Sequence, residues 1–218
     1  MYNFSMHYIY VPEFNGQKDS IPEEELHHLR VKRISDGEVF GILNGRGRIT
    51  YVYFREGMIF QKGVENLSQP KDVFICSPLP QGKRGSFLVE KLSEIGIKGF
   101  VPLITERSRR KVNISKLEKH VIAGMKQSGN PWKMAVYPPM NLQDVVREFS
   151  GHSLYFGDRE GEKPEMGIKG VFIVGPEGGL SENEKGFLLK NGVRPLSIGR
   201  YILRVETAAI GFSLLSML

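Results

Sequence analysis

Residues 171–184 read VFIVGPEGGLSENE, and this stretch decides the fold class. Val171–Val174 is a short apolar run typical of a buried strand. The next five residues contain three glycines, which let the backbone take up positive φ and approach a ligand closely. Ser181 then suits a helix N-cap, with Glu184 three residues on to complete a capping box. A strand, a glycine-bearing loop and a capped helix in direct succession indicate an α/β domain.

The same alternation of strands and helices extends over the chain from about residue 71. It predicts a mostly parallel sheet with helices on its faces. We expect strands at 72–77, 100–104, 171–174 and 196–198, a short strand at 154–156, and helices at 86–95, 116–128 and 206–218.

The first seventy residues have a different, β-rich pattern. Val39–Leu43 and Ile49–Phe54 are β-branched and aromatic runs, and the Asn-Gly pair between them favours a type I′ hairpin turn. A short helix is expected within residues 22–33. Because residues 67–71 are polar and contain a proline, we place a domain boundary there, which gives domains 1–70 and 71–218.

Composition and charge limit the function. The 218 residues are 40% hydrophobic and carry a net charge of +6, an ordinary globular composition. The excess charge is concentrated in residues 81–133, where 12 basic residues face 4 acidic ones. Such a local positive field attracts polyanions, of which nucleic acid is the commonest, although a solvated helix face explains the charge equally well. A single cysteine, Cys76, and the lack of a signal-like or membrane-spanning run predict a cytosolic protein with no Cys-rich metal site.

Two loops carry the candidate chemistry. The loop that begins at Gly175 is neither G-x-G-x-x-G nor a P-loop, and Glu177 within it would repel a pyrophosphate. It therefore suits a ligand with positive or hydrogen-bond-donating groups. The second loop leads from Ile198 through Arg204 into a helix that is apolar on nearly every side. A helix of that kind needs a covering surface, which favours a homodimer over a central core helix.

Taken together, GPEGGLSENE and IGRYILRVETA resemble the signature of the RsmE-type family of SPOUT methyltransferases, which make N3-methyluridine in small-subunit (16S) ribosomal RNA. Family-like segments also occur at 28–33, 89–97, 101–108 and 126–129. The chain departs from the usual family pattern at Asn130 and Tyr201, where the family commonly has arginine.

The resemblance implies a PUA-like, RNA-binding N-terminal β-barrel and a SPOUT domain whose mostly parallel sheet is tied in a trefoil knot. It further implies a homodimer that binds S-adenosylmethionine and acts on ribosomal RNA or the assembled 30S subunit, without a metal. Carried over from the family motifs, the cofactor-binding residues are Gly175, Glu177, Gly178, Ser197, Ile198, Gly199 and Leu203.

The resemblance also suggests how the reaction is catalysed. Arg204 is expected to stabilise the negative charge that develops on the uridine carbonyl oxygens. Glu206 is expected to orient Arg204 or to accept the proton, with orientation favoured because a neighbouring arginine lowers a carboxylate's pKa. The RNA-binding candidates are Arg30, Lys32, Arg33, Lys83, Arg84, Arg107, Arg109, Arg110 and Lys111.

Two alternative functions remain open at this point. One is an RNA-binding protein of the same fold that has lost turnover, a reading that the departures at Asn130 and Tyr201 permit. The other is a dinucleotide-binding oxidoreductase, which the acidic loop and the missing G-x-G-x-x-G argue against.

Overall fold

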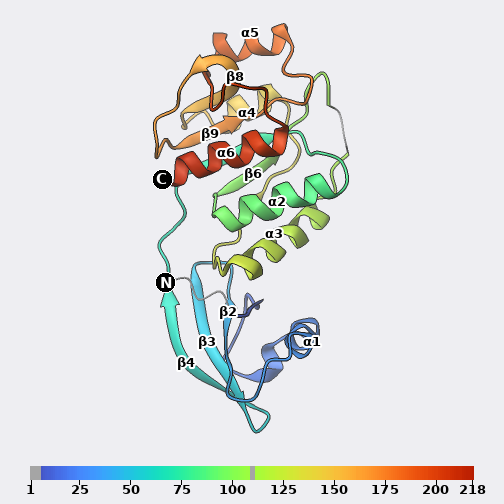
Figure 1. Ribbon diagram of the computed structural model, residues 1–218, viewed down its shortest axis with the longest axis vertical. Helices are drawn as coiled ribbons and strands as arrows, with labels where there is room; N and C mark the ends of the chain where they lie inside the picture. Colours follow the sequence, from blue (N-terminus) through green and yellow to red (C-terminus); the bar gives the residue numbers. More distant parts are fainter. Residues whose placement is uncertain (1–5, 109–110) are drawn as a thin grey trace. The chain divides into compact units, whose positions relative to one another are not determined.

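The computed structural model describes residues 6–108 and 111–218. The chain divides into two compact units (Figure 1). The N-terminal unit contains Met1–Gln69 and Val121–Lys133, and the C-terminal unit contains Pro70–His120 and Met134–Leu218. The division near residue 70 resembles the domain boundary expected from the sequence, but Val121–Lys133 departs from the continuous second domain of that expectation.

Contacts with the first seventy residues explain why Val121–Lys133 belongs to the N-terminal unit. The second half of helix α3 (Ile114–Ser128) carries Lys126, whose ammonium bonds both carboxylate oxygens of Glu25 at 2.8 and 2.9 Å. Just beyond α3, the Gly47 N–H donates to the Pro131 carbonyl at 3.0 Å, and the Trp132 ring lies directly against Gly47. These contacts are made between distant parts of the sequence, so no local pattern announced them.

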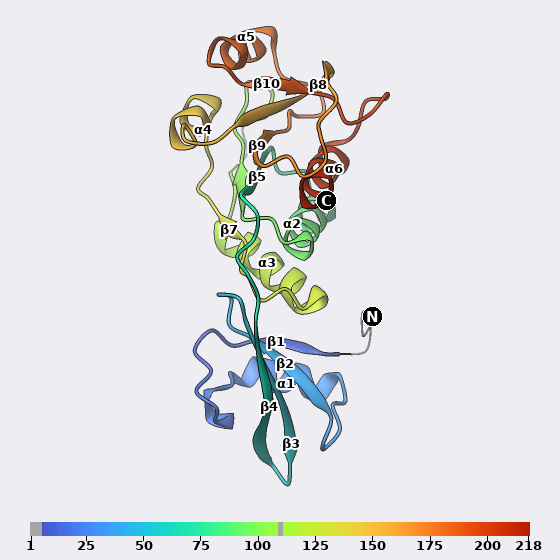
Figure 2. The same ribbon diagram turned by 90° about the vertical axis from the view of Figure 1, so that its left-hand side faces the viewer.

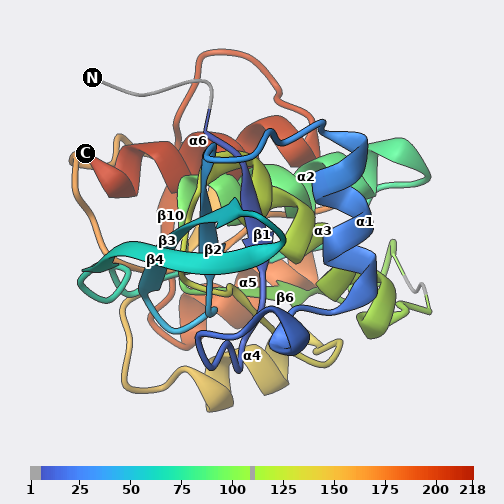
Figure 3. The same ribbon diagram turned by 90° about the horizontal axis from the view of Figure 1, so that it is seen from below.

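The N-terminal unit is built on one four-stranded sheet of order β1-β2-β3-β4, with α1 beside the strands (Figure 3). Its core contains Ile9, Leu29 and Phe40. A β-barrel was expected here, and in the described residues the strands pair as this four-stranded sheet. The elements are β1 (Tyr8–Tyr10), the 3₁₀ turn η1 (Lys18–Ser20), α1 (Glu23–Val31), β2 (Val39–Leu43), β3 (Arg48–Arg55) and β4 (Met58–Asn66).

The β2–β3 hairpin forms as predicted, but the expected type I′ turn is wrong. Positive φ occurs at Gly45 (77°) and Gly47 (92°) but not at Asn44, where a type I′ turn would require it. The Asn44 side chain accepts hydrogen bonds from the backbone of Arg46 and Arg48 at 2.8 and 3.0 Å. The Asn44 side chain therefore holds together a loop that is longer than a two-residue turn. The two positive φ angles of this loop lie at Gly45 and Gly47.

The C-terminal unit is an α/β layer structure around a six-stranded sheet of order β10-β8-β9-β5-β6-β7, in which every pairing is parallel. Helices α2 and α6 cover one face, and α4 and α5 the other (Figure 2). The expected parallel α/β sheet is thus confirmed. The elements are β5 (Val73–Ser77), α2 (Lys83–Ile95), β6 (Gly99–Pro102), β7 (Ala135–Val136), α4 (Leu142–Glu148), β8 (Leu154–Glu162), β9 (Gly170–Ile173), α5 (Glu182–Lys190), β10 (Arg194–Leu196) and α6 (Val205–Met217).

Strands β5, β6 and β9 are buried along their whole length, as expected for the centre of a parallel sheet. Cys76 lies in β5 with no exposed surface, and burial raises the pKa of its thiol. On the α6 side, the rings of Phe172 and Phe212 stack at 5.2 Å between centroids.

Helix α6 is buried along one face, where Ala209 and Phe212 pack inward. Its outward face still carries large apolar side chains, among them Leu214, which is 51% exposed. The structure thus leaves part of an apolar helix uncovered in the single chain. In the described parts of the chain, no helix is long and apolar enough to cross a membrane.

Candidate active site

The two glycine-bearing loops of the sequence lie at one edge of the large sheet. The first loop, residues 174–181, follows β9, and the second loop, residues 197–204, follows β10. Since both strands run parallel to β8 between them, their carboxyl ends share an edge. Open α/β sheets bind ligands at this edge.

A cluster of three charged side chains, Arg84, Glu177 and Glu206, joins the first loop to the start of α6. Arg84, in the first turn of α2, donates from Nε and Nη2 to the two carboxylate oxygens of Glu206 at 2.8 and 2.9 Å. Its remaining terminal nitrogen, Nη1, lies 2.7 Å from a carboxylate oxygen of Glu177. One guanidinium therefore bridges the first loop and α6.

The surroundings of Glu206 favour its ionised form. Its side chain is only 12% exposed, and the hydrogen bonds from Arg84 are the main cause of a lowered pKa. Its own backbone N–H and the charge of Arg204 lower that pKa further. The carboxylate stays ionised and is therefore a weak proton acceptor. Glu206 forms its hydrogen bonds with Arg84, whereas the sequence predicted that it would orient Arg204.

The first loop has further supports besides Arg84. A terminal nitrogen of Arg107 donates to the Gly178 carbonyl, and Leu180 is buried in the core under α5. The predicted capping box is confirmed: Ser181 Oγ accepts from the Glu184 N–H at 3.2 Å, and the Glu184 carboxylate accepts from the Ser181 N–H at 2.8 Å.

The second loop is held more sparsely and is exposed. The Ser197 N–H donates to the Glu162 carbonyl at 2.8 Å, and the Ser197 hydroxyl donates to the Gly199 carbonyl at 3.3 Å. Ile198 lies so close to Gly211 of α6 that a Cβ there would come within 2.7 Å of its Cδ1. At the end of the loop, Arg204 is the N-cap residue of α6 and its side chain is exposed.

The cations predicted to bind RNA fall into separate groups. Lys83 and Lys111 are exposed in the C-terminal unit, where Arg84 and Arg107 instead contact protein groups of the first loop. Three candidates, Arg30, Lys32 and Arg33, lie in the N-terminal unit and are exposed there. Arg30 forms an ion pair with Glu23. Arg109 and Arg110 lie outside the described residues.

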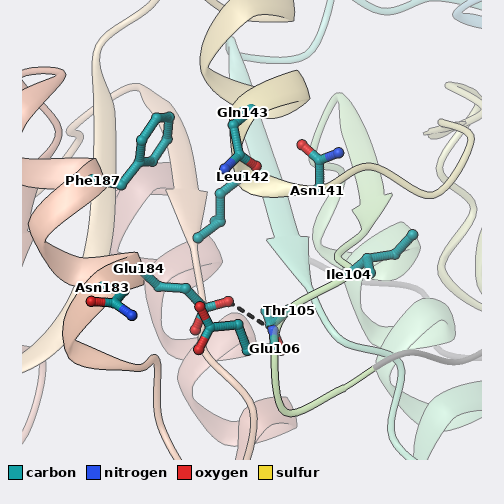
Figure 4. A pocket seen from close by; sticks show the side chains of 9 residues that line it. All are labelled: Ile104, Thr105, Glu106, Asn141, Leu142, Gln143, Asn183, Glu184 and Phe187. Carbon is teal, nitrogen blue, oxygen red and sulfur yellow. Dashed lines mark hydrogen bonds between the residues drawn. The ribbon is translucent and has the colours of Figure 1, made fainter.

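A pocket of about 400 Å³ opens on the α4–α5 side of the same sheet edge (Figure 4). One side is formed by Thr105 and Glu106 after β6, and another by Glu184 and Phe187 of α5. The Glu184 carboxylate also accepts the Glu106 N–H at 2.9 Å across it. Its lining contains none of the predicted site residues, so this pocket is separate from the two loops.

Sequence reasoning missed the tie between Glu184 and Glu106 and the bridge made by Arg84. The available signal for Arg84 was its position, because two basic residues in the first turn of a helix oppose the helix dipole. Among the described residues, no group of three or more His, Cys, Asp or Glu side chains is arranged to hold a metal ion.

Comparison with known proteins defines the class of this site. Residues 67–216 match the family described as the RNA methyltransferase domain, and residues 21–49 match the RNA methyltransferase PUA domain. The chain therefore belongs to the RNA methyltransferase family, which confirms the resemblance found in its motifs.

Individual relatives agree with this assignment. The chain is 33% identical, over 94% of its length and 96% of the relative's, to a ribosomal RNA small subunit methyltransferase E from Aquifex aeolicus. A methyltransferase structure from Legionella pneumophila, in complex with the cofactor SAM, is 25% identical with a TM-score of 0.78 over 95% of both chains. A ribosomal RNA small subunit methyltransferase E from Neisseria gonorrhoeae shares the fold, with a TM-score of 0.82 at 21% identity over 95% of both chains.

Proposed function

We propose that this protein transfers a methyl group from S-adenosylmethionine to N3 of a uridine in small-subunit ribosomal RNA. The observation that carries the proposal is the convergence of both glycine-bearing loops and Arg204 on one sheet edge, in a chain of the RNA methyltransferase family. Similarity to the Aquifex aeolicus relative over nearly the whole chain supports the choice of ribosomal RNA.

The residues at this edge fit S-adenosylmethionine. The cofactor has a positive sulfonium and ammonium, an apolar adenine and several hydrogen-bonding groups. Glu177 supplies negative charge in the first loop, while Ile198 and Leu203 supply apolar surface in the second. The full set that we propose to contact the cofactor is Gly175, Glu177, Gly178, Ser197, Ile198, Gly199 and Leu203. When bound, the cofactor supplies an electrophilic methyl group.

Arg204 is the residue that we propose to act on the uridine. As the N3 proton leaves, negative charge spreads onto the two flanking carbonyl oxygens. An exposed guanidinium at the start of α6 can donate hydrogen bonds to those oxygens. Glu206 cannot readily take the proton, because Arg84 holds its pKa low. We therefore place Glu206 in a supporting role and leave proton removal to a group of the bound RNA or solvent.

RNA binding is proposed to use the exposed lysines and arginines of both units. Lys83 and Lys111 belong to the C-terminal unit, and Arg30, Lys32 and Arg33 to the N-terminal unit, whose residues match the PUA description. Such contacts mainly neutralise phosphates, so affinity should fall steeply with added salt.

The same proposal includes a cytosolic homodimer with a trefoil-knotted sheet. The exposed apolar side chains of Leu214 on α6 and of Leu218 directly after it support a second copy as the covering partner. The close packing of Ile198 on Gly211 is consistent with the second loop passing tightly against α6 in a knot. Light scattering should give a dimer for the purified protein and a monomer for Leu214→Glu.

The decisive experiment is nucleoside analysis of ribosomal RNA from cells with and without the gene. Mass spectrometry should show N3-methyluridine in small-subunit RNA only when the gene is present. Purified protein with S-adenosylmethionine should restore it on 30S subunits or RNA from the deletion strain. Unchanged N3-methyluridine after deletion, together with retained RNA binding, would favour the non-catalytic alternative.

A further inference from the structure

Arg84 occupies a position that helix electrostatics alone would not select. It lies in the first turn of α2 next to Lys83, and that turn contains no acidic residue. Cations at a helix N-terminus face the positive end of the macrodipole, which is unfavourable. A residue that breaks a local rule commonly has a function outside its own helix.

The contacts of Arg84 show where that function lies. Its guanidinium spans two carboxylates, Glu206 in α6 and Glu177 in the first loop, through three different nitrogens. It is only 38% exposed, and the two carboxylates raise its pKa still further above neutrality. A planar guanidinium can donate two parallel hydrogen bonds to one carboxylate, which the ammonium group of lysine cannot do.

We propose that Arg84 is a positioning residue for methyl transfer, which fixes the first loop against the start of α6 and so sets the spacing of the two proposed cofactor loops. The inference rests on the proposed function, because it concerns the same site. It replaces the expectation that Arg84 binds RNA, and it separates the role of Glu206 from that of Arg204.

The charges of the cluster argue against a phosphate contact. One guanidinium and two carboxylates carry a net charge of −1, and three guanidinium nitrogens already face carboxylate oxygens. Glu177, which is mostly exposed and paired with Arg84, would repel a phosphate that approached the guanidinium. Lys83, its neighbour, is exposed and has no such carboxylate bridge in the described residues.

Removal of Arg84 would affect both loops at once. Glu206 would lose the two charged hydrogen bonds that compensate its burial, and it would then face Glu177 without an intervening cation. Leaving a buried carboxylate without its partner is strongly unfavourable. The two carboxylates would separate or one would take up a proton, and in either case the cofactor loops would lose their fixed spacing.

The test compares Arg84→Ala and Arg84→Lys with the matched control Lys83→Ala, each checked for folding by thermal melting. Isothermal titration with S-adenosylmethionine should show affinity weakened by about tenfold to a hundredfold for Arg84→Ala and less for Arg84→Lys. RNA binding measured against salt should keep its slope in the Arg84 variants. Lys83→Ala should retain cofactor affinity and reduce that slope by about one phosphate contact.

A pH profile separates positioning from simple structural damage. The charged groups that act on Glu206 are Arg84 from α2 and Arg204 just before α6, and the Arg84 guanidinium also pairs with Glu177 of the first loop. In the wild type Glu206 stays ionised to a lower pH than an ordinary glutamate, because its pKa is lowered. Without Arg84 its pKa should rise, so kcat/KM of Arg84→Ala should decline at a higher pH on the acid side than that of the wild type.

The outcomes are distinguishable. Failure of the wild type to bind S-adenosylmethionine would contradict the proposed function. Wild-type cofactor affinity and pH profile in Arg84→Ala, or a reduced salt slope for RNA in that variant, would overturn the positioning role. Should Arg84→Ala not fold, Arg84→Lys decides alone: wild-type cofactor affinity in that variant overturns the inference, and weakened affinity with an unchanged salt slope supports it.

Discussion

The two loops at the sheet edge look equivalent in the sequence but differ in how the fold holds them. In the first loop, Glu177 pairs with Arg84, Gly178 accepts from Arg107, and Leu180 is buried. In the second loop, the consecutive side chains of Tyr201 and Ile202 are 76% and 84% exposed. Side chains anchor the first loop, whereas the middle of the second loop is open to solvent.

This difference indicates a division of labour. A loop supported by buried and ionic contacts is preformed and can bind a small cofactor with little ordering cost. An exposed loop that ends at Arg204 can adapt to a large substrate or to a second protomer. We therefore expect changes in the supports of the first loop to act mainly on cofactor affinity, and changes at Arg204, where the second loop ends, to act mainly on turnover.

The largest effect is expected for Arg204→Ala in the second loop. Loss of one donor to a developing oxyanion should lower kcat by about 10²–10³-fold. Cofactor affinity should remain close to that of the wild type, since no cofactor contact is removed. Steady-state assays with radiolabelled S-adenosylmethionine and undermethylated 30S subunits measure the first quantity, and calorimetry measures the second.

Arg200→Ala is the matched control, because it removes an exposed arginine from the same loop. Its effect on kcat should be much smaller. Equal losses for the two arginines, or normal turnover by Arg204→Ala, would show that the guanidinium of Arg204 does not act on the uridine.

Arg107→Ala tests the first loop and should produce the opposite pattern. Without its donor to the Gly178 carbonyl, the loop loses one anchor, and cofactor affinity should fall by about tenfold. The value of kcat at saturating cofactor should change little. Lys111→Ala, which removes a nearby exposed cation in the sequence, should lower RNA affinity alone; a kcat-only defect in Arg107→Ala would argue against the division of labour.

Glu184→Ala should destabilise the support beneath the first loop. The carboxylate accepts the N–H groups of both Ser181 and Glu106, so its loss leaves two backbone donors without this partner. The free energy of unfolding should fall by about 1–2 kcal/mol, as measured by urea denaturation. Glu182→Ala, an exposed change in the same helical turn, should alter it by less than about 0.5 kcal/mol. Similar losses in both variants would contradict the role of the capping box.

The capping box was predictable because it depends on residues three apart, as was the strand Val39–Leu43, which the structure reproduces to the residue. Patterns of this kind are set by nearby residues and survive in the fold. Strand β4 and helix α4 were missed, since β4 is mostly exposed and lacks a strong apolar alternation, and α4 has only seven residues.

The geometry of the site was beyond reach for a different reason. The pairing of Arg84 with Glu206 joins residues 122 apart in the chain, and only the order of the parallel strands brings them together. The sequence identified both residues as functional candidates but connected them to other partners, because charge patterns do not specify which long-range pair forms.

The smallest expected effect concerns how the second loop meets α6, and it is tested with a pair of glycines. Gly186 in α5 faces open space, so Gly186→Ala should stabilise the protein by about 0.5–1 kcal/mol through helix propensity. At Gly211 an added Cβ would come within 2.7 Å of Ile198 Cδ1, so Ile198 must move. Gly211→Ala should therefore gain less than Gly186→Ala in urea denaturation and should weaken cofactor binding slightly. Equal stabilisation in both variants, with unchanged cofactor affinity, would mean that the second loop does not depend on its contact with α6, and the contrast with the firmly anchored first loop would then be sharper still.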